Sequence, residues 1–181
     1  MRDKMIEKLS LTALFVALVF LGTFTFKIPA PFGYMHLGDC MILLAVLILG
    51  GKRGAVAGAI GAGLADIISG YAVWFIPTVI CKSLMALSMG YIISKKILGL
   101  KGRVLWMTGA IFGGILQSIG YTITRIIFYG TAPAIASIPL LLVQTGLGIV
   151  FAFVLSEALQ KTALRKVFLY TTDSKGVNQS C

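Results

Sequence analysis

The sequence predicts an all-α integral membrane protein of six transmembrane helices, with both termini in the cytoplasm. Two observations indicate the membrane class. The mean hydropathy is +0.96, and only 12% of the 181 residues are charged, about half the share found in soluble domains. A third observation, the uneven distribution of basic residues along the chain, predicts the orientation of the helices.

Six apolar segments approach or exceed the roughly 20 helical residues that a hydrocarbon core requires. The expected spans are 10–28, 37–51, 54–72, 74–94, 104–128 and 134–159. No small-residue cleavage site follows the first apolar run, so we interpret this run as a retained helix and not as a signal peptide. We expect residues 1–166 to form a single six-helix membrane domain and 167–181 to form a polar, disordered tail.

The second span is short, because fifteen residues reach only about 22 Å at the helical rise. A re-entrant hairpin is the alternative, but its tip would place Lys52 and Arg53 in lipid at a cost of several kcal/mol. We therefore favour a short crossing that begins below the membrane surface. Residues 36–39 would then lie at membrane depth, where irregular backbone is tolerated only inside protein or beside a cavity.

The third span is rich in glycine and alanine at four-residue spacing. Gly54 and Gly58 form one such pair, and Ala57 and Gly61 form another. Small residues at this spacing let membrane helices approach closely, so we assign them to packing. The fifth span repeats the spacing with Gly109 and Gly113.

The net charge of +10 reflects orientation in the membrane, and we do not expect nucleic-acid binding. With the N-terminus in the cytoplasm, thirteen of the sixteen basic residues fall on the cytoplasmic side: Arg2, Lys4, Lys8, Lys52, Arg53, Lys95, Lys96, Lys101, Arg103, Lys161, Arg165, Lys166 and Lys175. This excess follows the positive-inside rule for an even number of crossings. Of the remaining three, Lys27 lies in an outer loop, and Lys82 and Arg125 lie inside spans.

Polar side chains inside the fourth and fifth spans form two stripes. The fourth span carries Trp74, Thr78 and Lys82, and the fifth carries Gln117, Tyr121 and Arg125. A four-residue step keeps each trio on one helical face. Because the two helices run in opposite directions, we expect Trp74 and Arg125 near the outer surface, with Lys82 and Gln117 about 12 Å deeper.

These stripes and polar residues of other spans predict a small-molecule pocket supplied by five helices. The expected ligand-binding residues are His36, Asp39, Tyr71, Trp74, Thr78, Lys82, Gln117, Tyr121, Arg125 and Gln144. Two acids, Asp39 and Asp66, balance two bases in the outer half, which favours a neutral or zwitterionic ligand.

Structural roles for the same residues remain open from sequence alone. Asp39 could be a helix N-cap, and Asp66 is expected mainly to neutralise Lys82 or Arg125. His36 could be a hydrogen-bonded loop residue. Tyr71 and Trp74 could belong to an interfacial aromatic belt.

Motifs for catalysis, ATP hydrolysis and metal binding are absent from the sequence. The stretches GGKRG and GLKGR lack the spacing and the hydroxyl of a phosphate loop. There is no H-E-x-x-H or G-x-S-x-G motif, and the three cysteines have no metal-ligand spacing. We therefore expect a protein that is not an enzyme, has no cofactor, and draws energy from an ion gradient or a partner.

Two stretches of the chain carry a family likeness. Residues 33–71 read GYMHLGDCMILLAVLILGGKRGAVAGAIGAGLADIISGY, and residues 76–92 read IPTVICKSLMALSMGYI. They resemble the substrate-binding S components of energy-coupling factor (ECF) vitamin transporters, which are ABC-type importers. The resemblance implies a cell-membrane protein that captures a water-soluble vitamin at its outer face. It also implies association with a transmembrane coupling subunit (EcfT-like) and two ATPase subunits.

The resemblance further assigns roles to two segments. It implies that the long first loop, FKIPAPFGYMHLGD at 26–39, is a lid over the ligand. It also implies that Ala13 and Ala17 on the first helix dock the coupling subunit, as an Ala-x-x-x-Ala pair that permits close helix approach.

The ligand predicted from the neutral, aromatic-lined pocket is a small ring compound such as pyridoxine or hydroxymethylpyrimidine. Riboflavin and pantothenate S components are alternatives of the same class. A stand-alone ion-coupled secondary transporter, with Asp39 or Asp66 as the coupling carboxylate, is the alternative from another class. A third interpretation is an assembly subunit that binds no ligand.

Overall fold

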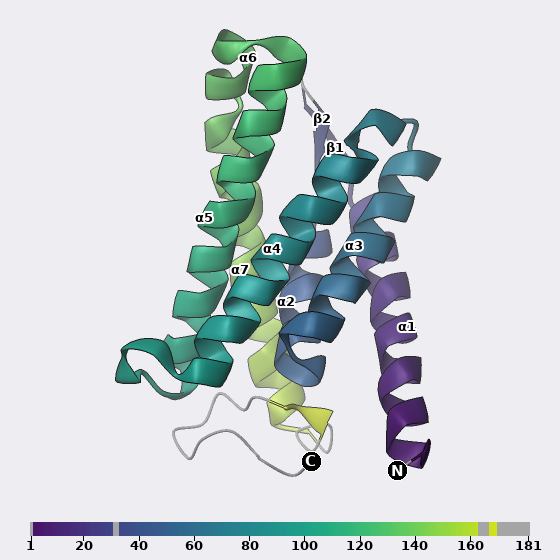
Figure 1. Cartoon of the computed structure of the whole chain (residues 1–181), viewed down its shortest axis with the longest axis vertical. Coiled ribbons are helices and arrows are strands. Elements are labelled where there is room, and N and C mark those ends of the chain that lie inside the picture. Colours follow the sequence, from purple (N-terminus) through teal and green to yellow (C-terminus); the bar gives the residue numbers. More distant parts are fainter. Residues whose placement is uncertain (1, 31–32, 163–166, 170–181) are drawn as a thin grey trace.

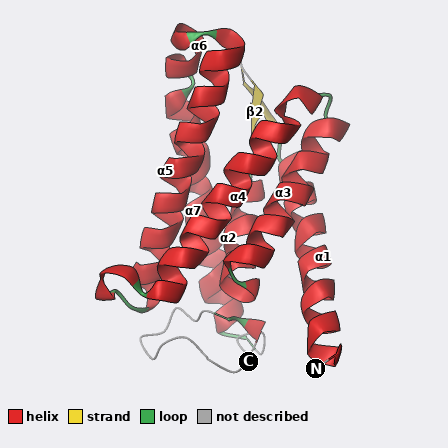
Figure 2. Ribbon diagram, viewed as in Figure 1, coloured by secondary structure: helices red, strands yellow, loops and turns green. Residues whose placement is uncertain are grey.

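The computed structural model describes residues 2–30, 33–162 and 167–169 of the chain. Its helices are α1 (Arg2–Phe24), α2 (Gly38–Leu49), α3 (Gly51–Ile68), α4 (Phe75–Lys95), α5 (Gly102–Tyr129), α6 (Thr131–Ala136) and α7 (Ile138–Gln160) (Figure 1). The short 3-10 turns η1 (Ala72–Trp74) and η2 (Ile97–Gly99) flank α4, and an antiparallel pair of strands, β1 (Ile28–Ala30) and β2 (Gly33–Met35), follows α1. Figure 2 shows helices throughout the bundle and this single small hairpin. The predicted helical class is confirmed, whereas the hairpin and the six-residue α6 were not predicted.

Within the described residues, four helical segments are long and apolar enough to cross a membrane: Met5–Phe24, Ala72–Lys95, Gly102–Tyr129 and Thr131–Gln160. The helix α2 is apolar but shorter. The helix α3 carries Lys52, Arg53 and Asp66, which lower its hydropathy, yet it runs alongside α1 and α4 (Figure 1). The six predicted spans thus correspond to the six longer helices of the described residues.

The helix α2 lies in the centre of the bundle. It begins beneath the β1–β2 hairpin and ends near the N-terminal end of the molecule, where Gly50 alone connects it to α3 (Figure 1). This course fits the predicted short crossing. The helices α1, α3, α4 and α7 pack around α2, and ten of its twelve residues are buried. A helix that is apolar all round needs such surroundings.

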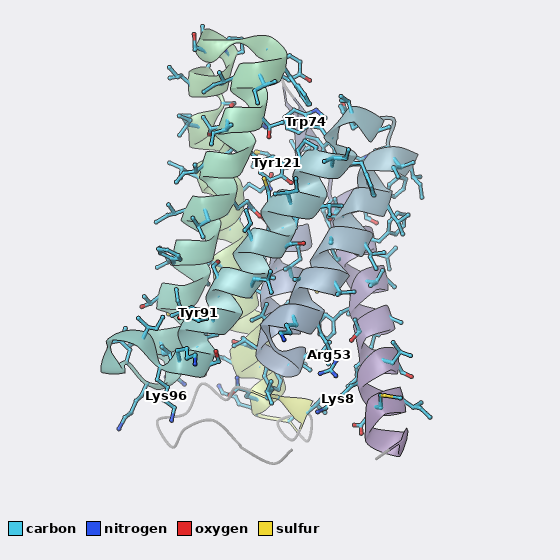
Figure 3. All side chains as sticks on the ribbon, in the orientation of Figure 1. Lys8, Arg53, Trp74, Tyr91, Lys96 and Tyr121 are labelled. Atoms are coloured by element: carbon cyan, nitrogen blue, oxygen red, sulfur yellow. The ribbon has the colours of Figure 1, made fainter. Side chains whose placement is uncertain are left out.

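Basic side chains gather at one end of the bundle. Figure 3 shows Lys8, Arg53 and Lys96 at the end where the N-terminus lies. The end of α7 lies there too (Figure 1). This shared end is what the positive-inside pattern predicted, and its assignment to the cytoplasm stays a prediction.

The core extends beyond the predicted domain boundary at residue 166. Phe168 is only 2% exposed and belongs to the main apolar core. Residues 163–166 and 170–181 lie outside the described part of the chain, so most of the predicted tail does as well.

Glycines permit close contacts between the helices. A Cβ at Gly54 would lie 2.6 Å from Cγ2 of Val46, and one at Gly61 would lie 2.6 Å from the carbonyl oxygen of Val16. These contacts confirm the packing role predicted for the third span. A close contact between backbones joins α3 to α4, where a Cβ at Gly90 would lie 2.4 Å from Cα of Gly51.

We expect Gly90→Ala to destabilise the protein by about 1–3 kcal/mol, because the backbone of Gly51 cannot move aside for a methyl group. Gly146→Ala is the matched control. A Cβ there meets nothing within 4 Å, so the greater helix propensity of alanine makes this change neutral or stabilising by up to about 1 kcal/mol. Unfolding of the purified proteins in detergent measures both effects. Equal stability of the two variants would contradict the backbone contact.

Candidate ligand-binding site

A cavity lies between the helices, and part of the space within it is open to solvent. It is lined by Tyr34, His36, Asp66, Tyr71, Trp74, Thr78, Tyr121, Arg125, Leu141 and Gln144. Figure 3 shows Trp74 and Tyr121 in the half of the bundle away from the N-terminus.

Seven of the ten predicted ligand-binding residues line this cavity: His36, Tyr71, Trp74, Thr78, Tyr121, Arg125 and Gln144. The other three, Asp39, Lys82 and Gln117, are not among its lining residues. Asp66 also lines it; the sequence placed this acid in the outer polar set but assigned it mainly to charge compensation. Tyr34 and Leu141 line it without having been predicted to do so. Tyr34 could have been found as an aromatic residue of the long first loop, whereas nothing in the sequence distinguishes Leu141.

The two predicted stripes, one on the end of η1 and on α4 and the other on α5, face one another as a three-step ladder. At the first step the Arg125 guanidinium lies 5.7 Å from the ring centroid of Trp74. At the second, the hydroxyl of Tyr121 donates to Oγ1 of Thr78 at 3.1 Å. At the third, Nζ of Lys82 donates to Oε1 of Gln117 at 2.9 Å. The predicted antiparallel pairing of the two faces is therefore confirmed.

The deepest step of the ladder belongs to a buried polar network centred on Asp39. Nζ of Lys82 lies 2.5 Å from Oδ1 of Asp39, and both side chains are almost fully buried. Nε2 of Gln117 donates to Oδ2 of Asp39 at 2.9 Å, and Nε2 of Gln144 donates to the same oxygen at 3.3 Å. The charges therefore compensate each other inside the protein, as buried ions require.

This network corrects two expectations. Asp39 is not the N-cap of α2, because Leu37 holds that position and no side chain caps the helix. Asp66 forms an ion pair with neither Lys82 nor Arg125 among the described residues. The two acids pair differently because they lie at different depths in the bundle. Asp39, at the start of the buried helix α2, is level with Lys82. Asp66 lies near the C-terminal end of α3, beside the hairpin.

Asp66 binds the hairpin instead. The hydroxyl of Tyr34 on β2 donates to Oδ1 of Asp66 at 2.5 Å. Burial, followed by the nearby carboxylate of Asp66, raises the pKa of Tyr34, so the phenol keeps its proton and remains a donor. Lys27 adds a second attachment, since its Nζ donates to Oγ of Ser69 at 2.6 Å. The hairpin is thus held against the end of α3.

Two charged groups on the cavity wall keep buried atoms without partners. Nε and Nη1 of Arg125 and Oδ2 of Asp66 have no hydrogen-bond partner among the described residues. A buried polar atom without a partner is costly, and more so on a charged group. These atoms offer donors on one wall and an acceptor on another, which suits a ligand that carries both kinds of group.

His36 is held in the segment between β2 and α2. Its Nδ1 accepts a hydrogen bond from the backbone N–H of Gly38 at 3.1 Å, and its Nε2 lies 3.5 Å from Nε2 of Gln144. Burial is the main cause that lowers the pKa of His36 to about 4, with the positive charge of Lys82 second. The ring is therefore neutral at physiological pH.

Comparisons with known proteins agree with this architecture. Residues 3–161 match the family model described as ECF-type riboflavin transporter, S component. The chain is 32% identical over 171 residues to the thiamine precursor transporter HmpT of Lactococcus lactis subsp. cremoris (strain MG1363), an alignment that covers 93% of this chain and 96% of that protein. It is 35% identical over 134 residues to an uncharacterized protein of Pyrococcus woesei, covering 74% of this chain and 87% of the relative.

The chain belongs to the ECF-type S-component family. Members of this family are transporter subunits and not enzymes. With its several apolar helices, this S component is a multi-pass protein of the cell membrane.

The S component presents the predicted docking residues on its surface. Ala13 and Ala17 are both exposed on α1, one helical turn apart. Their small side chains leave the backbone of α1 open to another helix. Docking of a coupling subunit at this face stays a prediction.

We expect the His36 ring of the purified S component to stay neutral from about pH 8 down to about pH 5. Burial disfavours the imidazolium, so protonation is displaced below the ordinary pKa of about 6.5. His36 is the only histidine of the chain, so ¹³C-histidine labelling with a histidine-free affinity tag gives one ring signal to follow by NMR. A transition centred near pH 6.5 would mean that the ring is exposed to solvent.

Proposed function

We propose that this S component captures a small, single-ring, water-soluble vitamin or vitamin precursor at its outer face, with hydroxymethylpyrimidine or pyridoxine as the best candidates. In this proposal, a transmembrane coupling subunit and two ATPases then drive delivery into the cell. The observation that carries the proposal is the aromatic-lined cavity in which Arg125 and Asp66 keep unpaired polar atoms.

The chemistry of the cavity supports an aromatic ring. Trp74 and Tyr121, with ring centroids 6.1 Å apart, and Tyr71 offer faces for stacking on an aromatic ligand. Arg125 would donate to a ligand acceptor, and Asp66 would accept from a hydroxyl or amino group.

The similarity to a thiamine precursor transporter over almost the whole of both chains also supports a small precursor. The description of the matching family model supports riboflavin as the alternative ligand within the same class of transporter. Pantothenate is a further alternative, although it would leave the aromatic faces of the cavity without a ring to stack on.

The first loop is suited to act as the lid. Tyr34 contributes to the cavity wall, and its ring lies 5.1 Å from that of Tyr71. We propose that release of the Tyr34–Asp66 and Lys27–Ser69 hydrogen bonds opens the hairpin for ligand entry.

A stand-alone ion-coupled transporter is less well supported. A coupling carboxylate must exchange its proton or ion with water during transport, but Asp39 is 1% exposed and already bound by Lys82, Gln117 and Gln144. Asp66 holds the lid residue Tyr34 with one oxygen.

Ligand binding tests the proposed function. Trp106→Phe leaves Trp74 as the only tryptophan and hence as a fluorescent reporter in the cavity. In this background we expect saturable quenching by hydroxymethylpyrimidine or pyridoxine. Arg125→Ala and Asp66→Asn should each weaken binding by roughly 10-fold or more, as expected on loss of a hydrogen bond to a charged group. Arg103→Ala, which removes an arginine outside the cavity, should leave affinity unchanged.

Two results would contradict the proposed ligand: binding of riboflavin or pantothenate alone, or no binding of any of these compounds. Uptake into vesicles then separates the classes of transporter. We expect uptake only when the coupling subunit and ATPases are present. Uptake by this chain alone under a proton or sodium gradient would indicate a secondary transporter.

A further inference from the structure

The buried carboxylate of Asp39 determines how the amide of Gln144 is oriented. An ionised carboxylate only accepts hydrogen bonds, so Gln144 must turn its nitrogen toward Oδ2 of Asp39, 3.3 Å away. The opposite orientation would set two acceptor oxygens against each other. Oε1 of Gln144 therefore faces away from Asp39, and it accepts no hydrogen bond from the described residues, although Gln144 lines the cavity.

The backbone determines the tautomer of His36 in a similar way. Nδ1 accepts the N–H of Gly38, so in the neutral ring Nδ1 carries no hydrogen and Nε2 carries one. The nearest polar neighbour of Nε2 is the amide nitrogen of Gln144 at 3.5 Å, which is itself a donor directed at Asp39. Two donors do not form a hydrogen bond, so the Nε2–H of His36 has no acceptor in the described part of the chain.

We propose that the cavity wall presents the Nε2–H of His36 and Oε1 of Gln144 as a neighbouring donor and acceptor, with His36 held in its role by the backbone of Gly38 and Gln144 held in its role by Asp39. Lys82 acts indirectly, through Asp39. Its Nζ lies 2.5 Å from Oδ1 of Asp39 and keeps this carboxylate paired and ionised. Asp39 and Lys82 are thus positioning residues, and His36 and Gln144 determine specificity.

This arrangement, which rests on the proposed function, selects a class of ring. A ligand meets both groups if a ring nitrogen with a free lone pair lies beside an exocyclic amino group. A 4-aminopyrimidine has this edge. Its 4-oxo counterpart has nearly the same shape but reverses the order, with an N–H in the ring and an oxygen outside it. Pyridoxine has no amino group beside its ring nitrogen, so the inference favours the aminopyrimidine.

The tautomer of His36 can be measured without any ligand. In protein labelled with ¹⁵N-histidine, the two ring nitrogens of the single histidine report directly which one is protonated. At about pH 7 we expect a neutral ring with hydrogen on Nε2. A ring with hydrogen on Nδ1, or a charged ring, would overturn the inference.

The selectivity for ligands tests the role of Asp39. We expect the wild-type protein to bind 4-amino-5-hydroxymethyl-2-methylpyrimidine at least about tenfold more tightly than its 4-oxo analogue, since a reversed edge leaves buried groups unpaired. Asp39→Asn should reduce this ratio to below about threefold, because an amide can face Gln144 with either its nitrogen or its oxygen. A purely structural role of Asp39 would weaken both ligands equally and preserve the ratio.

Two further variants complete the experiment. Gln144→Met removes the acceptor and should lower the ratio without abolishing it, because the Nε2–H of His36 remains to favour a ring nitrogen with a free lone pair. The inference therefore remains testable if Asp39→Asn does not fold. Thr145→Val is the matched control, because Thr145 contacts the network only through a 3.4 Å hydrogen bond from Gln117. It should keep the wild-type ratio.

An unchanged ratio in both Asp39→Asn and Gln144→Met would overturn the inference and leave the proposed function standing. Failure of the wild-type protein to bind either pyrimidine or pyridoxine would instead contradict the proposed function, and with it the ligand class inferred here. The NMR result would then still decide whether His36 is held as described.

Discussion

The ion pair between Asp39 and Lys82 is the interaction on which the rest of the site depends. Both groups are almost completely buried in the middle of a helical bundle, where an uncompensated charge would cost several kcal/mol. Each therefore restricts where the other can lie: Lys82 fixes the height of α4 against the start of α2, and Asp39 draws the amides of Gln117 and Gln144 from α5 and α7 toward the same point. One carboxylate thus connects four helices directly below the cavity.

The same constraint explains why the chain between α1 and α2 is long. The helix α2 must begin inside the bundle for Asp39 to reach Lys82, so the preceding segment has to descend from the end of α1 to that depth. On the way it places Tyr34 and His36 in the cavity wall and forms the hairpin that Asp66 and Ser69 hold. This one segment therefore contributes Tyr34 to the lid, His36 to the cavity wall and, at the start of α2, Asp39 to the buried network.

Much of the fold could be predicted from the sequence, because hydropathy and four-residue spacing are local properties. The ladder between α4 and α5 followed directly from the positions of Trp74, Thr78 and Lys82 and their counterparts. The pairing of the acids could not be predicted, because it depends on the depth at which α2 begins. For the same reason Asp39, Lys82 and Gln117 were expected to contact ligand, although their polar groups satisfy one another beneath the cavity. Leu141 and the hairpin gave no local signal at all.

A double-substitution cycle at Asp39 and Lys82 tests the account most directly. Lys82→Met and Asp39→Leu should each destabilise the protein by about 3–5 kcal/mol, because each leaves the opposite charge buried without a partner. The double variant Asp39→Leu/Lys82→Met should recover most of this stability while failing to recover ligand affinity, since Gln144 no longer has a carboxylate to orient it. Independent, additive losses of stability in the two single variants, or a double variant that binds ligand as the wild-type protein does, would contradict a site organised by this buried pair.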